Sequence, residues 1–330
     1  MHFDVFNGDA DGIIALVQLR LSKPKNSTLI TGVKRDISLL KQVPIERASS
    51  VTVLDISMEK NTDALTELLE SNVDVFYVDH HRSGTIPISD KLTALINTDA
   101  NTCTSLLVND YLNGQFVNWA ITAAFGDNMN HSAVELANKQ GLSEHQQAQL
   151  KALGIYINYN GYGRTIDDLH IAPADLFEAC LAFEDPLTLI NSPDSIFSLL
   201  ASAYKADMAK AQSAEVLADH DTCKVMLLAD EAWSRRVSGV FGNELANQSP
   251  DKAHAVLTLN EGAELEHSTS SFDEATYTVS LRAPLNNKQG ADNICIQFPT
   301  GGGRAGAAGI NQLPKKMLGK FISTVAEYYA

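Results

Sequence analysis

The sequence predicts an α/β protein with a parallel sheet in its N-terminal part and a smaller α+β domain at its C-terminus. Strand-like and helix-like segments alternate in the first third, helical segments dominate the middle, and β-branched segments return in the last third. Such alternation is typical of βαβ units and therefore of a parallel sheet. With 330 residues, the chain is also long enough for two domains of ordinary size.

The expected N-terminal strands are short and apolar, and the segments between them carry apolar residues at helical spacing. We expect strands at residues 2–6, 28–33, 50–56 and 73–81, with helices at 12–21 and 63–71. Near-continuous apolar strands indicate a sheet that is covered on both faces. A Rossmann-like domain is therefore predicted.

The rest of the chain is expected to be helical and then mixed. Helices are predicted at 104–112, 118–126, 132–140, 144–154 and 173–183, followed by a long connecting helix at 194–220. Strands of a mixed sheet are predicted at 223–229, 254–259, 276–282 and 294–298, with helices at 238–248 and after Pro314. We expect a first domain at 1–190, a connection at 191–218, a second domain at 219–330, and a cleft between the domains.

Composition narrows the function classes. The net charge is −15 and the pI is about 4.9, which argues against a partner such as long double-stranded nucleic acid, because that contact needs a basic surface. The four cysteines are far apart and form no CxxC pair, so a zinc ribbon is not expected. The N-terminus lacks a signal-peptide pattern, and no apolar run reaches membrane-spanning length. A cytoplasmic protein without a membrane partner, monomeric or homodimeric, is predicted.

Acidic residues and histidines stand where the expected strands end. They are Asp9, Asp11, Asp55, Asp79, His80 and His81. The carboxyl ends of parallel strands meet at one edge of a sheet, so these side chains should converge if the strands are neighbours. Converging carboxylates repel each other unless a cation lies between them. Carboxylates with some imidazole and no thiolate favour Mn²⁺ or Mg²⁺. Taken alone, Asp9 or Asp11 could instead cap the helix that begins near Gly12.

The order of these residues resembles that of the DHH phosphoesterase superfamily, including its oligoribonuclease (nanoRNase-like) members. The N-terminal resemblance rests on the motif at residues 7–12, on Asp55, on the Asp79-His80-His81 triplet and on the motif at 126–128. The last third resembles the DHH-associated domain through residues 280–282 and the glycine run at 301–309.

The resemblance implies a role for each matching position. Asp11, Asp55, His80 and Asp127 would hold one Mn²⁺ or Mg²⁺ ion, and Asp9 and Asp55 would hold a second. Asp79 would support the site, and His81 would face the scissile phosphate. Arg282, Gly302, Gly303 and Arg304 would bind the phosphate or base of the substrate. From the residues themselves, Asn7 is a candidate for orienting water, and Arg82 for touching phosphate.

Two positions depart from the family pattern. Val5 stands where a metal-binding histidine is usual, so the ion beside Asp9 is expected to bind weakly. His131 or His2 could supply a replacement ligand, although a helix-start histidine is the simpler interpretation of His131. Arg304 stands where the glycine motif commonly ends in histidine, which points to a different substrate class.

The sequence thus favours a metal-dependent phosphoesterase that uses metal-activated water. Its expected substrates are short oligoribonucleotides, bisphosphate nucleosides or dinucleotides. An inorganic pyrophosphatase or polyphosphatase is one alternative. A nucleotide-binding sensor with a degraded catalytic site is another, motivated by Val5. The residues at 101–105 could bind phosphate at a helix N-terminus or only cap that helix. Tyr159, Tyr162 and Arg164 could stack a base or pack a loop.

Overall fold

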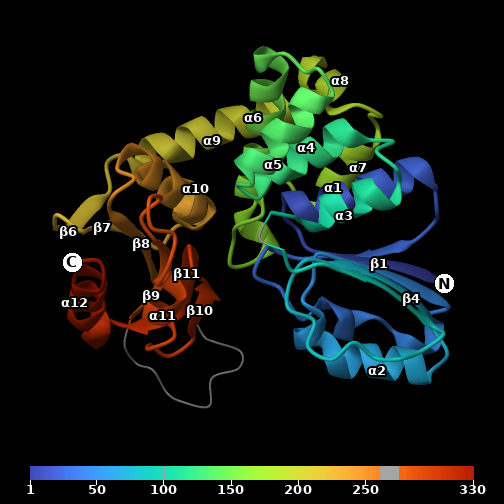
Figure 1. The fold of residues 1–330 in the computed structure, drawn as a ribbon, viewed down its shortest axis with the longest axis horizontal. Coiled ribbons are helices and arrows are strands. Elements are labelled where there is room, and N and C mark those ends of the chain that lie inside the picture. The colour runs from blue at the N-terminus through green and yellow to red at the C-terminus, as the bar shows by residue number, and fades with distance from the viewer. Residues whose placement is uncertain (100, 261–274) are drawn as a thin grey trace. The chain divides into compact units, whose positions relative to one another are not determined.

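The chain folds into two compact units, residues 1–203 and 204–330 (Figure 1). This computed structural model describes residues 1–99, 101–260 and 275–330. The division falls inside the segment 191–218, where the sequence predicts the connection between domains. Part of the expected second domain, residues 261–274, lies outside the described residues.

Unit 1 is built on a five-stranded, all-parallel sheet with the strand order β2-β1-β3-β4-β5. Its strands are β1 (His2–Phe6), β2 (Thr28–Ile30), β3 (Ser50–Leu54), β4 (Asp74–Asp79) and β5 (Leu92–Ile96). The parallel sheet is confirmed. Strand β5 is missing from the sequence prediction, because it is partly exposed and follows β4 without a helix between them.

Helices cover both faces of this sheet, as predicted. Helix α1 contacts β1, and α3 contacts β4, on one face, whereas α2 contacts β4 from the other face (Figure 1). The helices are α1 (Ala10–Ser22), α2 (Thr62–Glu70), α3 (Thr104–Tyr111), α4 (Val117–Gly126), α5 (Asn130–Lys139), α6 (Glu144–Asn160), α7 (Pro173–Leu181), α8 (Pro186–Asn191) and α9 (Ile196–Ala211), which crosses the unit boundary. Short 3₁₀ turns lie at Leu39–Gln42, Ile45–Arg47, Met58–Asn61 and Ile166–Asp168.

Side chains of the sheet divide between two hydrophobic clusters, because successive strand residues point to opposite faces. Phe6, Leu54 and Val78 belong to the cluster on the α1 face. Val5 and Val53 belong to the cluster on the α2 face. The strand register pairs Phe6 with Leu54 and Leu54 with Val78. The residues that follow these three, at the carboxyl ends of neighbouring strands, are therefore brought together.

The described residues of unit 2 form a six-stranded mixed sheet with the order β10-β11-β9-β8-β7-β6. Among these strands, β7 and β8 run parallel and the other neighbours pair antiparallel. Its strands are β6 (Glu215–Asp219), β7 (Cys223–Leu228), β8 (Ala253–Asn260), β9 (Thr276–Arg282), β10 (Gly301–Arg304) and β11 (Ala307–Pro314). Its helices are α10 (Ala232–Gln248), α11 (Ala291–Cys295) and α12 (Leu318–Tyr328), with a 3₁₀ turn at Lys315–Met317. The mixed sheet agrees with the predicted fold class.

Several predicted elements are wrong. Residues 294–298 are not a strand: residues 291–295 form α11, and Ile294, Cys295 and Phe298 are buried at helical spacing. The connecting helix stops at Ala211, and residues 215–219 form an edge strand instead. Helix α6 continues through Asn160, beyond its predicted end at residue 154.

Pro186 begins helix α8. It occupies the first turn of α8, where proline lacks only an N–H that would have no intrahelical partner. In the described part of the chain, no helix is both long and apolar enough to cross a membrane.

Candidate metal centre

Asp9 lies in the turn between β1 and α1 and caps the helix. Its Oδ1 accepts hydrogen bonds from the backbone N–H groups of Asp11, at 3.0 Å, and Gly12, at 3.1 Å. The turn packs tightly, because a Cβ on Gly8 would lie 1.9 Å from the carbonyl oxygen of Gly32. A side chain at position 8 would push the turn away from the segment after β2. The capping role expected of Asp9 or Asp11 therefore falls to Asp9.

Asp11, on the first turn of α1, is held by the N-terminus of α3. Its two carboxylate oxygens accept 2.7 Å hydrogen bonds from the backbone N–H groups of Thr104 and Ser105. A carboxylate is stabilised there by the exposed N–H groups and by the helix dipole. This helix N-terminus, weighed from the sequence as a phosphate site or a cap, thus binds a side chain of the protein itself.

Asp55 follows β3 in a left-handed backbone conformation, with φ of 58°. Its Oδ1 accepts a hydrogen bond of 3.2 Å from the Thr104 hydroxyl. Burial, together with the charges of the surrounding carboxylates, raises the pKa of Asp55 well above its ordinary value of 3.8. The main contributing charges are those of Asp9, Asp11, Asp79 and Asp127. Carboxylates so close together repel one another when they are ionised, and a cation between them would relieve that repulsion.

His80 is oriented as a metal ligand is. Its Nδ1 lies 3.1 Å from the carbonyl oxygen of Thr102, which can only accept a hydrogen bond. Nδ1 therefore carries a proton, and Nε2 faces Asp55 Oδ1 at 3.4 Å and Asp11 Oδ2 at 3.8 Å. Metal-binding histidines commonly donate their second ring N–H to a backbone carbonyl in this way.

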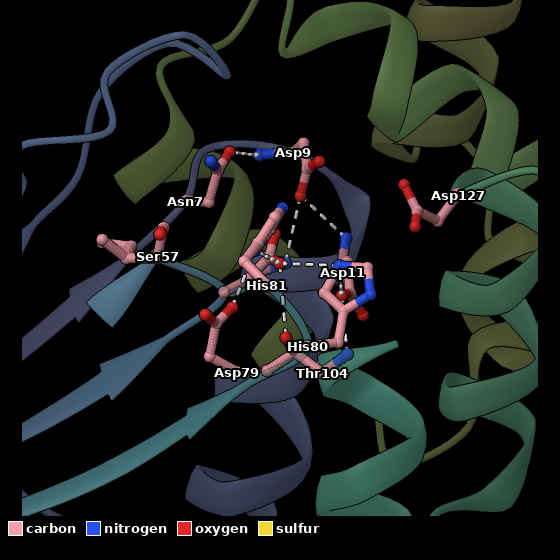
Figure 2. Close-up of polar contacts among 12 residues, drawn as sticks. Asn7, Asp9, Asp11, Ser57, Asp79, His80, His81, Thr104 and Asp127 are labelled. Carbon is pink, nitrogen blue, oxygen red and sulfur yellow. Dashed lines mark hydrogen bonds and ion pairs between the residues drawn. The ribbon is translucent and has the colours of Figure 1, made fainter. Parts of the chain in front are cut away.

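Asp79, at the end of β4, orients His81. Its Oδ1 lies 2.8 Å from His81 Nδ1, which also lies 3.7 Å from Asp55 Oδ1. Asp79 is fully buried, whereas the His81 side chain is 35% exposed (Figure 2). The pair thus presents an imidazole in fixed orientation beside the carboxylates.

Asp127 reaches the cluster from the carboxyl end of α4 (Figure 2). Burial raises its pKa above 3.8; the charge of Lys34 opposes that shift, and the charge of Asp11 adds to it. Its Oδ2 is buried without a hydrogen-bond partner among the described residues, as is Asp79 Oδ2. Buried carboxylate oxygens of this kind are unusual in a protein unless an ion satisfies them.

The donors fit a hard divalent cation. Single ligand atoms of Asp55, His80 and His81 all lie within 4.8 Å of one another. The acceptor atoms without partners, the mutual repulsion at Asp55 and the orientation of His80 together fit a site for a divalent cation. The geometry brings together Asp55, His80 and His81, with Asp11 Oδ2 3.8 Å from His80 Nε2. The ligand set Asp11, Asp55, His80 and Asp127, with Asp9 for a second ion, stays a prediction.

Lys34 belongs to this site and is absent from the sequence prediction. Its Nζ lies 2.5 Å from Asp9 Oδ2 and 3.7 Å from Asp127 Oδ1. Burial alone would lower the pKa of Lys34, but the charges of Asp9, Tyr162 and Asp127 raise it well above 10.5. A signal existed, because Lys34 follows a predicted strand directly at the same edge of the sheet.

Other expected residues lie elsewhere or act differently. Val5 is fully buried in the core. His2 bonds to Asp4 and Ser50 at the opposite end of β1, and His131 is exposed at the start of α5. Neither histidine is placed as the replacement ligand. Arg82 is exposed, and no contact ties its side chain to the cluster among the described residues.

Two further candidates have structural roles. Asn7 Oδ1 accepts from the backbone N–H of Asp9 at 3.2 Å, and Asn7 Nδ2 donates to the Lys34 carbonyl, also at 3.2 Å. Asn7 thus fixes the turn; its role with water stays a prediction. Tyr159 is fully buried and its hydroxyl bonds to His170, so it cannot stack a base.

The expected substrate residues of unit 2 lie on its sheet. Arg282, on β9, donates to Asn243 Oδ1 at 2.6 Å and to Ser280 Oγ at 3.1 Å. Gly302, Gly303 and Arg304 form the exposed edge strand β10. A Cβ on Gly302 would meet no atom within 4 Å, whereas Gly303 has a φ of 147° that only glycine adopts readily. Their role in binding stays a prediction.

Comparison with known proteins identifies the fold. No family model matches the chain, and no curated protein sequence matches it. Among solved structures, the RecJ exonuclease bound to manganese matches 99% of this chain and 90% of its own, with 15% identity and a TM-score of 0.57. RecJ of Thermus thermophilus in complex with Mn²⁺ has 16% identity and a TM-score of 0.54, with 99% of this chain and 52% of that chain covered.

The pGpG-specific phosphodiesterase PggH of Vibrio cholerae matches over its whole length. The match covers 100% of this chain and 99% of that one, with 10% identity and a TM-score of 0.56. These matches show that the chain shares the fold of RecJ and PggH, which agrees with the fold that the motif resemblance implies.

Proposed function

We propose that this protein is a divalent-metal-dependent phosphoesterase that hydrolyses short nucleotides. The observation that carries the proposal is the convergence of carboxylates and imidazoles at the carboxyl ends of β1, β3 and β4 (Figure 2). Ligands bind at this edge in open α/β sheets. The donor set matches Mn²⁺ or Mg²⁺, the ions that hydrolytic phosphoryl-transfer sites use.

The residues of the site have different roles in the proposed reaction. When bound, a divalent ion supplies a water of lowered pKa and neutralises phosphate charge. Asp11 and Asp55 hold the negative charge that attracts the ion, and His80 contributes a nitrogen in fixed orientation. His81, positioned by Asp79, is placed to bind the scissile phosphate or move a proton at Nε2.

Two observations favour a small substrate over a polymer. The net charge of −15 opposes binding along an extended phosphate backbone. PggH, similar over its full length, is a phosphodiesterase specific for pGpG, a dinucleotide. RecJ, similar in the same fold, is an exonuclease, so a slightly longer strand is the second possibility within this class.

The test is hydrolysis of a substrate panel by purified protein with Mn²⁺ or Mg²⁺. The panel comprises pGpG and other dinucleotides, oligoribonucleotides of three to five residues, a 3′,5′-bisphosphate nucleoside and inorganic pyrophosphate. Hydrolysis of a short nucleotide that disappears with EDTA and in Asp55→Asn supports the proposal. Turnover of pyrophosphate alone would replace it with the pyrophosphatase alternative.

A nucleotide-binding sensor is the second candidate, favoured by the buried Val5 and the ion pair between Lys34 and Asp9. A sensor binds nucleotide tightly without turning it over. Calorimetric binding of pGpG without any product after prolonged incubation with metal would select it.

A further inference from the structure

Lys34 places a fixed positive charge inside the carboxylate cluster. Its Nζ lies 2.5 Å from Asp9 Oδ2, 3.0 Å from Asn158 Oδ1 and 3.7 Å from Asp127 Oδ1. The Lys34 side chain is only 23% exposed. An ammonium so enclosed by acceptors differs from a surface lysine, which keeps its charge in water.

The main chain of Lys34 is anchored on both sides. Its backbone N–H donates to the Gly161 carbonyl at 2.8 Å, and its carbonyl accepts from Asn7 Nδ2 at 3.2 Å. Nζ also lies 5.4 Å from the centroid of the Tyr162 ring, within range of a cation–π contact. The position of the ammonium is therefore built by several elements of unit 1.

The Lys34 ammonium supplies a positive charge on the Asp9 side of the cluster, where Val5 stands in place of a metal-binding histidine. Asp9 Oδ2 lies 2.5 Å from Lys34 Nζ, and Asp9 Oδ1 accepts hydrogen bonds from two backbone N–H groups. Val5, two residues before Asn7 on β1, is buried in the core and offers no ligand on this side. Asp9 thus already has a cation in contact with it, whereas Asp55 Oδ1 faces the rings of His80, at 3.4 Å, and His81, at 3.7 Å.

We propose that the Lys34 ammonium takes the place of one of two divalent cations, so that the protein binds a single ion at Asp11, Asp55, His80 and Asp127. The inference rests on the proposed function, because it assumes that this cluster is the metal site. In the reaction, Lys34 would offer a phosphate oxygen a positive charge that needs no metal. The site would then hold one metal ion and the Lys34 ammonium in place of two metal ions.

The test is the stoichiometry and spectrum of bound Mn²⁺. Wild-type protein should bind one Mn²⁺ per chain by calorimetry, with the electron paramagnetic resonance of an isolated ion. Lys34→Met should bind the first ion more tightly, by about tenfold or more, because a unit charge beside a divalent ion is removed. It should also take up a second ion at high Mn²⁺. Lys34→Arg, which keeps the charge, should still bind one ion.

The controls separate this inference from the proposed function. Lys41→Met removes an exposed lysine and should leave Mn²⁺ binding unchanged. Two ions with an exchange-coupled spectrum in the wild-type protein would overturn the inference, as would Lys34→Met binding Mn²⁺ with wild-type number and affinity. A single ion without hydrolysis of any nucleotide would leave the inference standing and refute the function.

Discussion

The backbone N–H of Ser105 donates a 2.7 Å hydrogen bond to the carboxylate of Asp11. In return, the Ser105 hydroxyl donates to the Asp11 carbonyl at 2.8 Å. Helix α3 therefore begins on a side chain of helix α1, and a carboxylate of the proposed metal site also supports the packing of these two helices. Metal affinity and fold stability are coupled at this residue.

Asp11→Asn should weaken both properties, because an amide offers one acceptor oxygen where the Thr104 and Ser105 N–H groups need two. A lost cap costs about 1–2 kcal/mol, or roughly 2–8 °C in melting temperature. The measurement is thermal unfolding in EDTA and then with Mn²⁺. Asp127→Asn is the matched control, because Oδ2 of Asp127 has no hydrogen-bond partner among the described residues. It should lose the stabilisation by Mn²⁺ without losing stability in EDTA.

Asp55→Asn should stabilise the metal-free protein. The raised pKa of Asp55 means that its ionised form is disfavoured in the folded state, so the wild-type protein loses stability as pH rises from acid towards neutral. The amide removes this repulsion and keeps the acceptor for Thr104. We expect a gain of about 1 kcal/mol, roughly 2–4 °C at pH 7, with the stabilisation by Mn²⁺ abolished. A drop in the metal-free melting temperature would contradict this account of the cluster.

The surroundings of Asp4 predict a pH dependence of folding stability opposite to the one expected for Asp55. It is fully buried and bonded to Arg20, His2 and Ser27. Burial raises its pKa, but these hydrogen bonds and the Arg20 charge lower it from 3.8 to about 2. The stabilisation is therefore complete above pH 3.8 and is lost as pH falls towards 2. It amounts to about 2 kcal/mol.

Asp4→Asn should remove this pH dependence and cost roughly 3 kcal/mol at pH 7, because Arg20 is left without its buried partner. Denaturant unfolding between pH 2 and pH 7 measures both effects. Asp74→Asn, at an exposed position on β4, should behave as the wild type does. Parallel wild-type and Asp4→Asn stability curves would show that Asp4 is not the titrating group.

His81→Ala separates catalysis from metal binding. If His81 acts on the substrate, kcat should fall by about 10²–10⁴-fold, with Mn²⁺ affinity close to that of the wild type. Asp79→Asn should lower kcat less, because its remaining oxygen can still accept from His81 Nδ1. Loss of Mn²⁺ in step with kcat would instead assign His81 as a metal ligand, as its distance to Asp55 allows.

The sequence predicts the cluster well because strand-end residues of a parallel sheet share one edge. The prediction that Asp55 and Asp79 lie close together requires only that β3 and β4 are neighbours in the sheet. The apolar pattern of the two strands indicates this. Lys34 follows the predicted strand 28–33 at the same edge, but strand adjacency alone does not place it against Asp9. Its contact with Asp9 depends on the close approach of Gly8 to Gly32, which brings the segment after β2 against the first turn. Nothing in local composition encodes that approach.

The misassigned elements have a common physical cause. The apolar residues of α11 were too few to distinguish a short helix from a strand, and burial against the sheet decides between them. The polar and Ala-containing residues of β6 favour a helix by local preference, and pairing with β7 overrides that preference. Packing and pairing with other elements, which a single sequence does not show, determine the secondary structure of both segments.

Gly302→Ala tests whether the glycine strand of unit 2 binds nucleotide. A Cβ at Gly302 meets nothing within 4 Å, so the fold should tolerate it to within about 0.5 kcal/mol. A phosphate packed against the bare backbone would be displaced, so KM for a short nucleotide should rise severalfold while kcat changes little. Gly319→Ala, equally open and in the first turn of α12, should be stabilised slightly and keep its KM. An unchanged KM in Gly302→Ala would mean that the backbone at this position makes no close contact with the substrate.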